Sequence, residues 1–275
     1  ADPSSWQCRV YPKESHVMID DETGVKVLFA TTNTSTDLNL YFHERSWLPD
    51  ESMLIFTSDR EGKQEPFGYV AETGELVRLG PNGAADTQGY TAGKQTNSLY
   101  LISGHAVCEW KITLSFEAVP QKKQAAVRVS EHKICDLPLG VLPVSALNEN
   151  ADATRLSLAF KYPDSQRRDI VLMDKQTGVS HLIASVDWSV SHLQCSWTRP
   201  DLVMFARGGY TEGDRVPMMT DKEYSTIEPH ARIWFADLSA RPPWPLCYQR
   251  PGELITHECW WIDDLLTFCG GFLPE

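Results

Sequence analysis

The chain has 275 residues, of which 42% are hydrophobic and 10% aromatic, so it is long enough and apolar enough to bury a core. Its formal net charge of −12 and its lack of basic runs argue against a nucleic-acid partner, because phosphate recognition relies on clustered Lys and Arg. No apolar run reaches the roughly 18 residues of a membrane-spanning helix, so we expect no membrane partner. The composition favours a globular protein and leaves its cellular compartment open.

The first residues, ADPSSWQC, contain no apolar core of the kind found in signal peptides, and residues 1–5 resemble a cloning remnant. The seven cysteines are odd in number, and none are in the Cys-x-x-Cys spacing of zinc sites. We therefore expect neither a zinc centre nor a complete disulfide framework.

Three Thr-Gly turns recur along the chain at a regular interval. DETG, AETG and KQTG end in Gly24, Gly74 and Gly178, which lie 50 and 104 residues apart. Each turn lies between two apolar runs, a pattern typical of a β-hairpin whose glycine supplies a positive φ. Repeats of about 50 residues are typical of propeller blades. We predict that the three turns form outer hairpins of such blades.

A second repeated unit consists of a polar turn with Asp followed by an apolar strand. It occurs in SWLPDESMLIFTSDREG, NADATRLSLAFKYPDS, SWTRPDLVMFARGG and CWWIDDLLTFCGG, and predicts the inner strands of successive sheets. Helical periodicity is nearly absent. We predict an all-β fold, a single β-propeller domain of four-stranded blades over residues 1–275. The alternative, a pair of β-sandwiches, gives no reason for a Thr-Gly hairpin at this interval.

His192 and Gln194 lie where the segment SVSHLQC should enter a strand. Because side chains alternate along a strand, the two residues should share one face while Leu193 points to the other. The pair could line a pocket, or it could face water at a strand edge.

The chain resembles the oligogalacturonate lyases, seven-bladed propellers that cleave short pectin fragments. The resemblance runs through DDETGVKVLFAT, LYFHERSWLPDESMLIFTSDREG, DTQGY, DKQTG with DWSVSH, ARIWFADLS and ITHECWWIDDLLTF. It implies β-elimination on an acidic oligosaccharide. At about 50 residues a blade, this chain would supply about five to six blades, the C-terminal ones being absent. We expect either that the natural chain continues or that a second polypeptide completes the propeller.

In these lyases a histidine and an upstream arginine flank the substrate. The resemblance places them at His192 and Arg168, with Arg167 as the alternative because the register around QRRDIVL slips by one residue. The family's arginine is regarded as the base, yet a guanidinium has a pKa above about 12. With an ordinary pKa of about 6.5, His192 is the more natural proton acceptor. We therefore assign the base to His192 and the carboxylate clamp to Arg168, unless His192 is a structural histidine.

A metal site is also implied by the resemblance, since the family binds the uronate carboxylate with manganese held largely by histidines. His257 in ITHECW matches one of these ligands, while the others have no counterpart before Glu275. One histidine binds a divalent cation such as Mn or Ca too weakly by itself. The alternative is a histidine that lines the funnel without metal.

Further candidates surround this set. In YFHERSW, His43 and Arg45 would share one face of an extended segment and could grip the uronate, or they could form a surface ion-pair cluster. The long polar insertion between FARGG and ARIW could overhang the propeller funnel. Gln194 and Arg167 complete the candidate substrate-binding residues.

The leading functional hypothesis is a polysaccharide lyase, and the sequence does not decide between galacturonate and glucuronate substrates. A propeller that binds a glycan or protein without catalysis is the alternative, because one fold serves many functions.

Overall fold

The structure is a computed structural model that describes residues 5–81, 86–120, 122–208, 231–239, 241–250 and 253–272. Every regular element in these ranges is a β-strand, as predicted. The chain forms two compact units, Ala1–Lys133 and Ile134–Glu275, which are described in turn. The described residues contain no helix long and apolar enough to cross a membrane. The polar insertion after Gly208 and the first four residues lie outside the described ranges.

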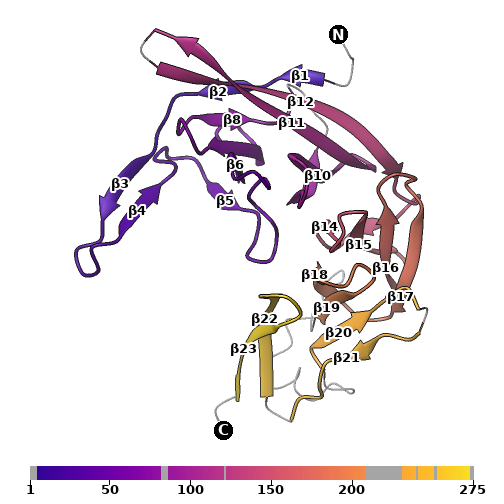
Figure 1. Cartoon of the computed structure of the whole chain (residues 1–275). Helices are drawn as coiled ribbons and strands as arrows, with labels where there is room; N and C mark the ends of the chain where they lie inside the picture. The colour runs from indigo at the N-terminus through magenta and orange to yellow at the C-terminus, as the bar shows by residue number, and fades with distance from the viewer. Residues whose placement is uncertain are drawn as a thin grey trace. The chain divides into compact units, whose positions relative to one another are not determined.

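The first unit consists of two five-stranded antiparallel sheets and one separate hairpin (Figure 1). The sheets have the strand orders β5-β6-β7-β8-β2 and β9-β10-β11-β12-β1, and β3 pairs only with β4. The strands are β1 (Ser5–Gln7), β2 (Arg9–Tyr11), β3 (His16–Ile19), β4 (Lys26–Phe29), β5 (Asp37–Asn39), β6 (Met53–Ser58), β7 (Glu65–Val70), β8 (Leu76–Arg78), β9 (Thr87–Ala92), β10 (Ser98–Ser103), β11 (Ala106–Val119) and β12 (Lys122–Asp136).

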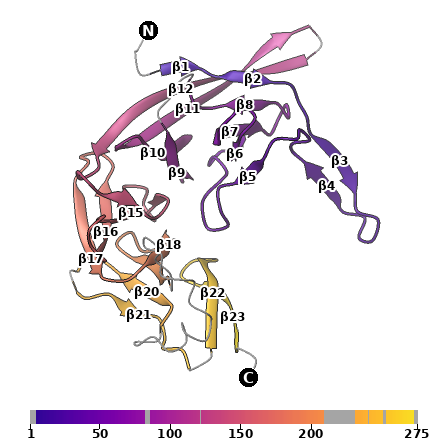
Figure 2. The ribbon, with the colours of Figure 1, turned by 180° about the vertical axis from the view of Figure 1, so that it is seen from behind.

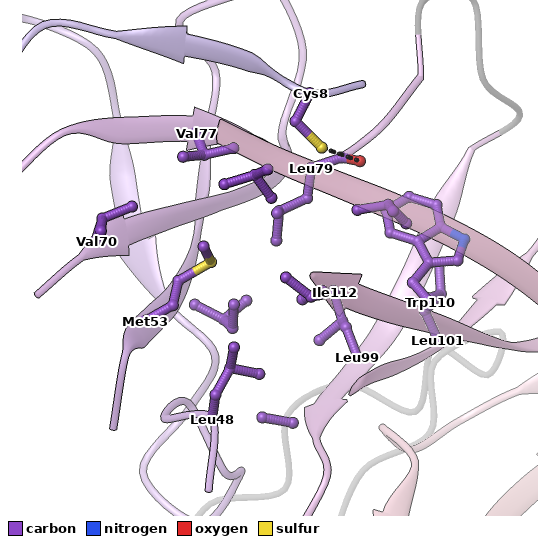
Figure 3. Close-up of a cluster of buried hydrophobic side chains, with 14 of the residues drawn as sticks. Cys8, Leu48, Met53, Val70, Val77, Leu79, Leu99, Leu101, Trp110 and Ile112 are labelled. Carbon is purple, nitrogen blue, oxygen red and sulfur yellow. Dashed lines mark hydrogen bonds between the residues drawn. The ribbon is translucent and has the colours of Figure 1, made fainter. Parts of the chain in front are cut away.

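One hydrophobic core joins the two sheets of this unit. Met53 and Ile55 of β6 and Leu99 and Leu101 of β10 are fully buried in it, because alternate residues of each strand face the neighbouring sheet. Figure 3 shows Met53, Leu99 and Leu101 together with Trp110, and the Cys8 thiol pointing to the Leu79 carbonyl. The Cys8 Sγ lies 3.9 Å from that oxygen. Burial raises the pKa of Cys8 to about 12, so this thiol is a core residue and not a reactive one.

The Thr-Gly turns form hairpins as predicted. Gly24, Gly74 and Gly178 have φ values of 70°, 74° and 71°, which a side chain would make unfavourable. In the first and third turns an Asp carboxylate accepts hydrogen bonds from the Thr backbone and hydroxyl: Thr23 binds Asp20, and Thr177 binds Asp174. These turns join β3 to β4, β7 to β8, and β16 to β17, and the last two pairs are the third and fourth strands of their sheets.

Arg60 anchors the β3–β4 hairpin to its neighbouring sheet. Its guanidinium donates to Glu14 at 2.8 Å and to both oxygens of Asp37 at 3.0 and 3.1 Å, with only 4% of the side chain exposed. The second oxygen of Glu14 accepts backbone hydrogen bonds from Thr32 and Asn33, just after β4. One buried cation therefore links β5 to both ends of the hairpin.

The second unit repeats the same architecture, as the view from behind shows (Figure 2). Its sheets have the orders β13-β15-β16-β17, with β14 also paired to β15, then β18-β19-β20-β21, and finally β22-β23. The strands are β13 (Leu142–Pro143), β14 (Asn148–Glu149), β15 (Arg155–Lys161), β16 (Arg168–Asp174), β17 (Ser180–Val186), β18 (Val190–Cys195), β19 (Val203–Arg207), β20 (Ile233–Ala236), β21 (Trp244–Pro245), β22 (Glu253–Trp260) and β23 (Leu266–Phe272).

The second repeated sequence unit forms the second strand of four of the described sheets, namely β6, β15, β19 and β23. The first strand of each of these sheets lies before the polar turn and almost entirely outside the repeated unit. Adjacent first strands are joined by buried polar contacts, such as the amide of Cys195 on β18 donating to the Asn148 side chain on β14 at 2.9 Å. These first strands position the candidate site.

Candidate catalytic site around His192

A β-bulge places His192. Ser191 pairs with Ala206 and Gln194 with Met204, so two residues of β18 lie opposite the single residue Phe205 of β19. His192, the first residue of the bulge, has a φ of 47°, in the left-handed region that side chains rarely adopt. The regular alternation expected for this segment is therefore wrong at this point.

The next sheet carries the same bulge at the same place. On β22, Thr256 pairs with Cys269 and Cys259 with Thr267, so His257 and Glu258 lie opposite Phe268 of β23. His257 is again the first bulge residue, with a φ of 53°. In the first unit, β9 has a bulge that begins at a glycine, Gly89, with a φ of 68°. Histidine thus stands twice where the local backbone favours glycine.

Glu258 binds His192 from the adjacent strand. Its Oε1 lies 2.7 Å from His192 Nδ1, and because a carboxylate only accepts, Nδ1 carries the proton in this contact. Arg232, just before β20, donates to both carboxylate oxygens, Nη2 to Oε1 at 3.1 Å and Nε to Oε2 at 3.3 Å. The Glu258 side chain is fully buried, whereas 16% of His192 and 14% of Arg232 is exposed. The carboxylate therefore orients an imidazole that still reaches the surface.

The environment keeps Glu258 ionised. Burial by itself would raise the pKa of this carboxyl, but the hydrogen bond from His192 and the positive charge of Arg232 outweigh it and lower the pKa to about 2. At neutral pH the group is a carboxylate that stabilises the Nδ1–H tautomer of His192 and would stabilise an imidazolium.

Gln194 has a different role from the expected one. Its amide nitrogen donates to the Glu258 carbonyl at 2.9 Å and to the His192 carbonyl at 3.3 Å, and its oxygen accepts from the Trp260 amide at 3.3 Å. The residue is only 3% exposed. The expectation that Gln194 shares an open face with His192 and binds substrate is therefore corrected: the bulge turns it inward, where it clamps β18 to β22.

The two arginine candidates are now distinguishable. Arg168 at the start of β16 is 2% exposed, and its Nη1 donates to the carbonyls of Ser165, Gln166 and Arg167 at 3.0 to 3.2 Å. The Arg167 side chain is 51% exposed and forms two hydrogen bonds with Asp169, at 2.8 and 2.6 Å. Arg168 is thus a buried cation, whereas Arg167 presents its guanidinium at the surface.

His43 and Arg45 belong to the first unit and lie in a turn and not in an extended segment. The Glu44 amide donates to the Tyr41 carbonyl at 3.1 Å, and residues 40–45 interrupt the pairing of the first strand with β6. The His43 ring is buried with its Nδ1 3.0 Å from Glu44 Oε1, whereas Arg45 is exposed. The predicted shared face of His43 and Arg45 is therefore wrong, because it assumed a strand.

The described residues do not assemble a metal site. His257 is exposed at the bulge of β22, and within the described ranges no three His, Cys, Asp or Glu side chains converge as metal ligands. All seven cysteines are free thiols. His257 alone does not fit a stably bound divalent cation, which needs three or four ligands.

Sequence reasoning missed two residues of this site, Glu258 and Arg232. Glu258 was expected on the opposite face from His257, and it is the bulge that brings it to His192. Arg232 was visible only as part of the ARIW motif. The charged residues in two otherwise apolar strand segments were the available signal, because a charge is rarely buried without a partner.

Comparison with solved structures identifies the fold. The chain superposes on an oligogalacturonate lyase in complex with manganese with a TM-score of 0.74 and 17% sequence identity, covering 97% of this chain and 68% of that one. An oligogalacturonate lyase from Vibrio parahaemolyticus gives a TM-score of 0.72, with the same identity and coverage. The chain has the oligogalacturonate lyase fold. Its sheets are therefore β-propeller blades, as the sequence predicted. The sequence matches no protein-family model and no curated protein sequence.

Proposed function

We propose that this protein is a polysaccharide lyase that cleaves uronate-containing oligosaccharides by β-elimination, with His192 as the proton acceptor. The observation that carries the proposal is the His192–Glu258 pair: a partly exposed imidazole in a left-handed bulge, oriented by a buried carboxylate. Backbone strain of this kind is typically found at functional sites. The shared fold supports the same reaction class.

His192 has the chemistry that the reaction requires. With the proton on Nδ1, the lone pair is on Nε2, which would take the C5 proton of the uronate. The electrons of that C–H bond form the C4–C5 double bond, and the bond from C4 to the glycosidic oxygen breaks. The proton held by His192 is then available to the leaving oxygen. Glu258 would stabilise the imidazolium formed between these steps.

A cation must offset the charge that develops on the uronate carboxylate in the transition state. Arg168 is the proposed clamp because the family resemblance points to it and its guanidinium is always charged. It is 2% exposed and its Nη1 donates to three carbonyls of its own turn, so contact with the uronate carboxylate requires that turn to open. The neighbouring lyase binds manganese, but the described residues of this chain do not fit such an ion, so the steps above use only side chains of the chain.

The test is the absorbance of the unsaturated product at about 235 nm during incubation with galacturonate or glucuronate oligomers, with and without added Mn²⁺ or Ca²⁺. The wild type should produce this signal with one of the two sugar classes. His192→Ala should reduce turnover by about 10² to 10⁴.

His181→Ala is the matched control, because this histidine is exposed on β17. It should retain full turnover. Absence of product with both sugars under every metal condition would contradict the proposal and favour a propeller that binds without catalysis.

A further inference from the structure

A hollow in the second unit has the composition of a sugar-binding site. It has a volume of about 400 Å³ and is lined by the turn between β15 and β16, the end of β17 with its connection to β18, and β20 with the segment before β21. The lining residues are Arg167, Ser185, Val186, Asp187, Trp188, Trp234 and Pro243. Apolar walls with a few polar groups are typical of small-ligand sites.

The aromatic wall is built onto the His192 strand pair. Trp188 is stacked against Phe205, with ring centroids 5.7 Å apart and 22° between planes, and it contacts Trp234 at 5.4 Å. Phe205 is the residue of β19 that lies opposite the His192 bulge. Trp188 therefore has a fixed position four residues before His192, where β18 begins.

Three polar groups at the hollow have no hydrogen-bond partner among the described residues: Arg167 Nη1, the Trp188 indole N–H and the Asp187 carboxylate. Asp169 holds the other edge of the Arg167 guanidinium, so the Nη1 donors are preorganised. Asp169 is itself bound by the hydroxyls of Ser185 and Tyr162, both at 2.8 Å. The residues that line the hollow thus supply two donors and an acceptor.

We propose that this hollow is a sugar subsite that binds one pyranose ring of the oligosaccharide. The ring packs against Trp188 and Pro243, and its hydroxyl groups bind the Asp187 carboxylate, Arg167 Nη1 and the Trp188 indole. Hydroxyl groups suit this set because they both donate and accept. The proposal rests on the proposed lyase function for its ligand class, and it gives Arg167 a role separate from that of Arg168.

The experiment follows the side-chain indole signals of the nine tryptophans by two-dimensional NMR during titration with a galacturonate tetramer. The titration uses His192→Gly, so that the tetramer is not consumed, and Trp188→Phe assigns the Trp188 signal. We expect this signal to shift in a saturable way. Asp187→Ala and Arg167→Ala should each raise the dissociation constant of the tetramer about fivefold or more, as expected for loss of a charged hydrogen bond.

Asp164→Ala is the matched control, because Asp164 is an exposed carboxylate on the same β15–β16 turn that does not line the hollow. It should leave the dissociation constant unchanged. An unshifted Trp188 signal at saturating tetramer, or equal binding by Asp187→Ala, would overturn the subsite. The spectra report the folding of every variant. Asp187→Asn is a second variant, which keeps the shape of the Asp187 side chain and removes its charge.

The absorbance assay on the chain with His192 intact separates the two proposals. A shifted Trp188 signal without lyase activity would leave the subsite standing and refute the reaction. Lyase activity with an unshifted Trp188 signal would support the reaction and refute the subsite.

Discussion

His192 and Glu258 come from adjacent strands, and each is part of a bulge in which two residues oppose one; their side chains meet at 2.7 Å. The two bulges are equivalent, yet they contribute different positions, the first residue on β18 and the second on β22. The contact depends on both bulges, because each one breaks the regular alternation of side chains along its strand.

Two substitutions at His192 distinguish the effect of backbone strain from the loss of the imidazole. His192→Gly and His192→Ala both remove the imidazole, but only alanine keeps a Cβ in the left-handed conformation. We expect His192→Gly to have a free energy of unfolding about 1 kcal/mol higher than that of His192→Ala, as measured by urea denaturation. Both should be equally inactive. Equal stability would show that the left-handed backbone at His192 is not strained.

The carboxylate of Glu258 should make stability depend on acid pH. Its pKa is lowered from the ordinary 4.5 to about 2, so the folded state binds this proton less readily than the unfolded state. The stabilisation is complete above about pH 4.5 and is lost as the pH falls toward 2, and it amounts to about 3 kcal/mol.

Glu258→Gln measures that contribution. Its free energy of unfolding should lie below that of the wild type at pH 7, and the gap should narrow as the pH falls from 4.5 to 2. A gap that stays constant over this range would rule out Glu258 as the titrating group.

Gln194 should be a stability residue. Gln194→Leu leaves the carbonyls of His192 and Glu258 and the amide of Trp260 without their buried partner. We expect a loss of about 2 to 4 kcal/mol in the free energy of unfolding. Gln176→Leu, at an exposed turn position, is the control and should change it by less than about 0.5 kcal/mol. A Gln194→Leu variant of normal stability that binds sugar poorly would restore the original substrate-binding assignment.

The proposed clamp role of Arg168 predicts a specific kinetic change. Arg168→Lys keeps a positive charge but loses the planar guanidinium that can bind a carboxylate through two donors. KM for the uronate oligomer should rise about tenfold or more, while Arg167→Lys should have a smaller effect on the shortest substrate that is cleaved. The opposite ranking of the two variants would move the clamp to Arg167.

Arg60 should hold the β3–β4 hairpin in place. Arg60→Ala leaves Glu14 and Asp37 without their shared cation, and we expect the free energy of unfolding to fall by about 3 kcal/mol. Hydrogen exchange should accelerate in β3 and β4 first. Arg9→Ala, which removes an ion pair with a 64% exposed arginine, should have little effect by comparison. Unchanged exchange in the hairpin would show that Arg60 does not anchor it.

The sequence by itself determined the elements whose signals are local. The turns at Gly24, Gly74 and Gly178 were predictable because Thr-Gly specifies a tight turn within a few residues, and in the first and third turns an Asp carboxylate also binds the Thr. Their spacing and the apolar strands between them indicated a propeller. His192 could likewise be selected, because histidine is the side chain that titrates near neutral pH.

Only the tertiary structure decided which residues accompany His192. Whether two residues of a strand oppose one depends on the register with the partner strand, and a bulge reverses the side-chain directions beyond it. For this reason Gln194 points inward and Glu258 reaches an imidazole 66 residues away in the chain. Arg232 joins them from the residue just before β20, 26 residues before Glu258. These contacts arise from packing between strands of separate sheets, which short-range sequence patterns do not encode.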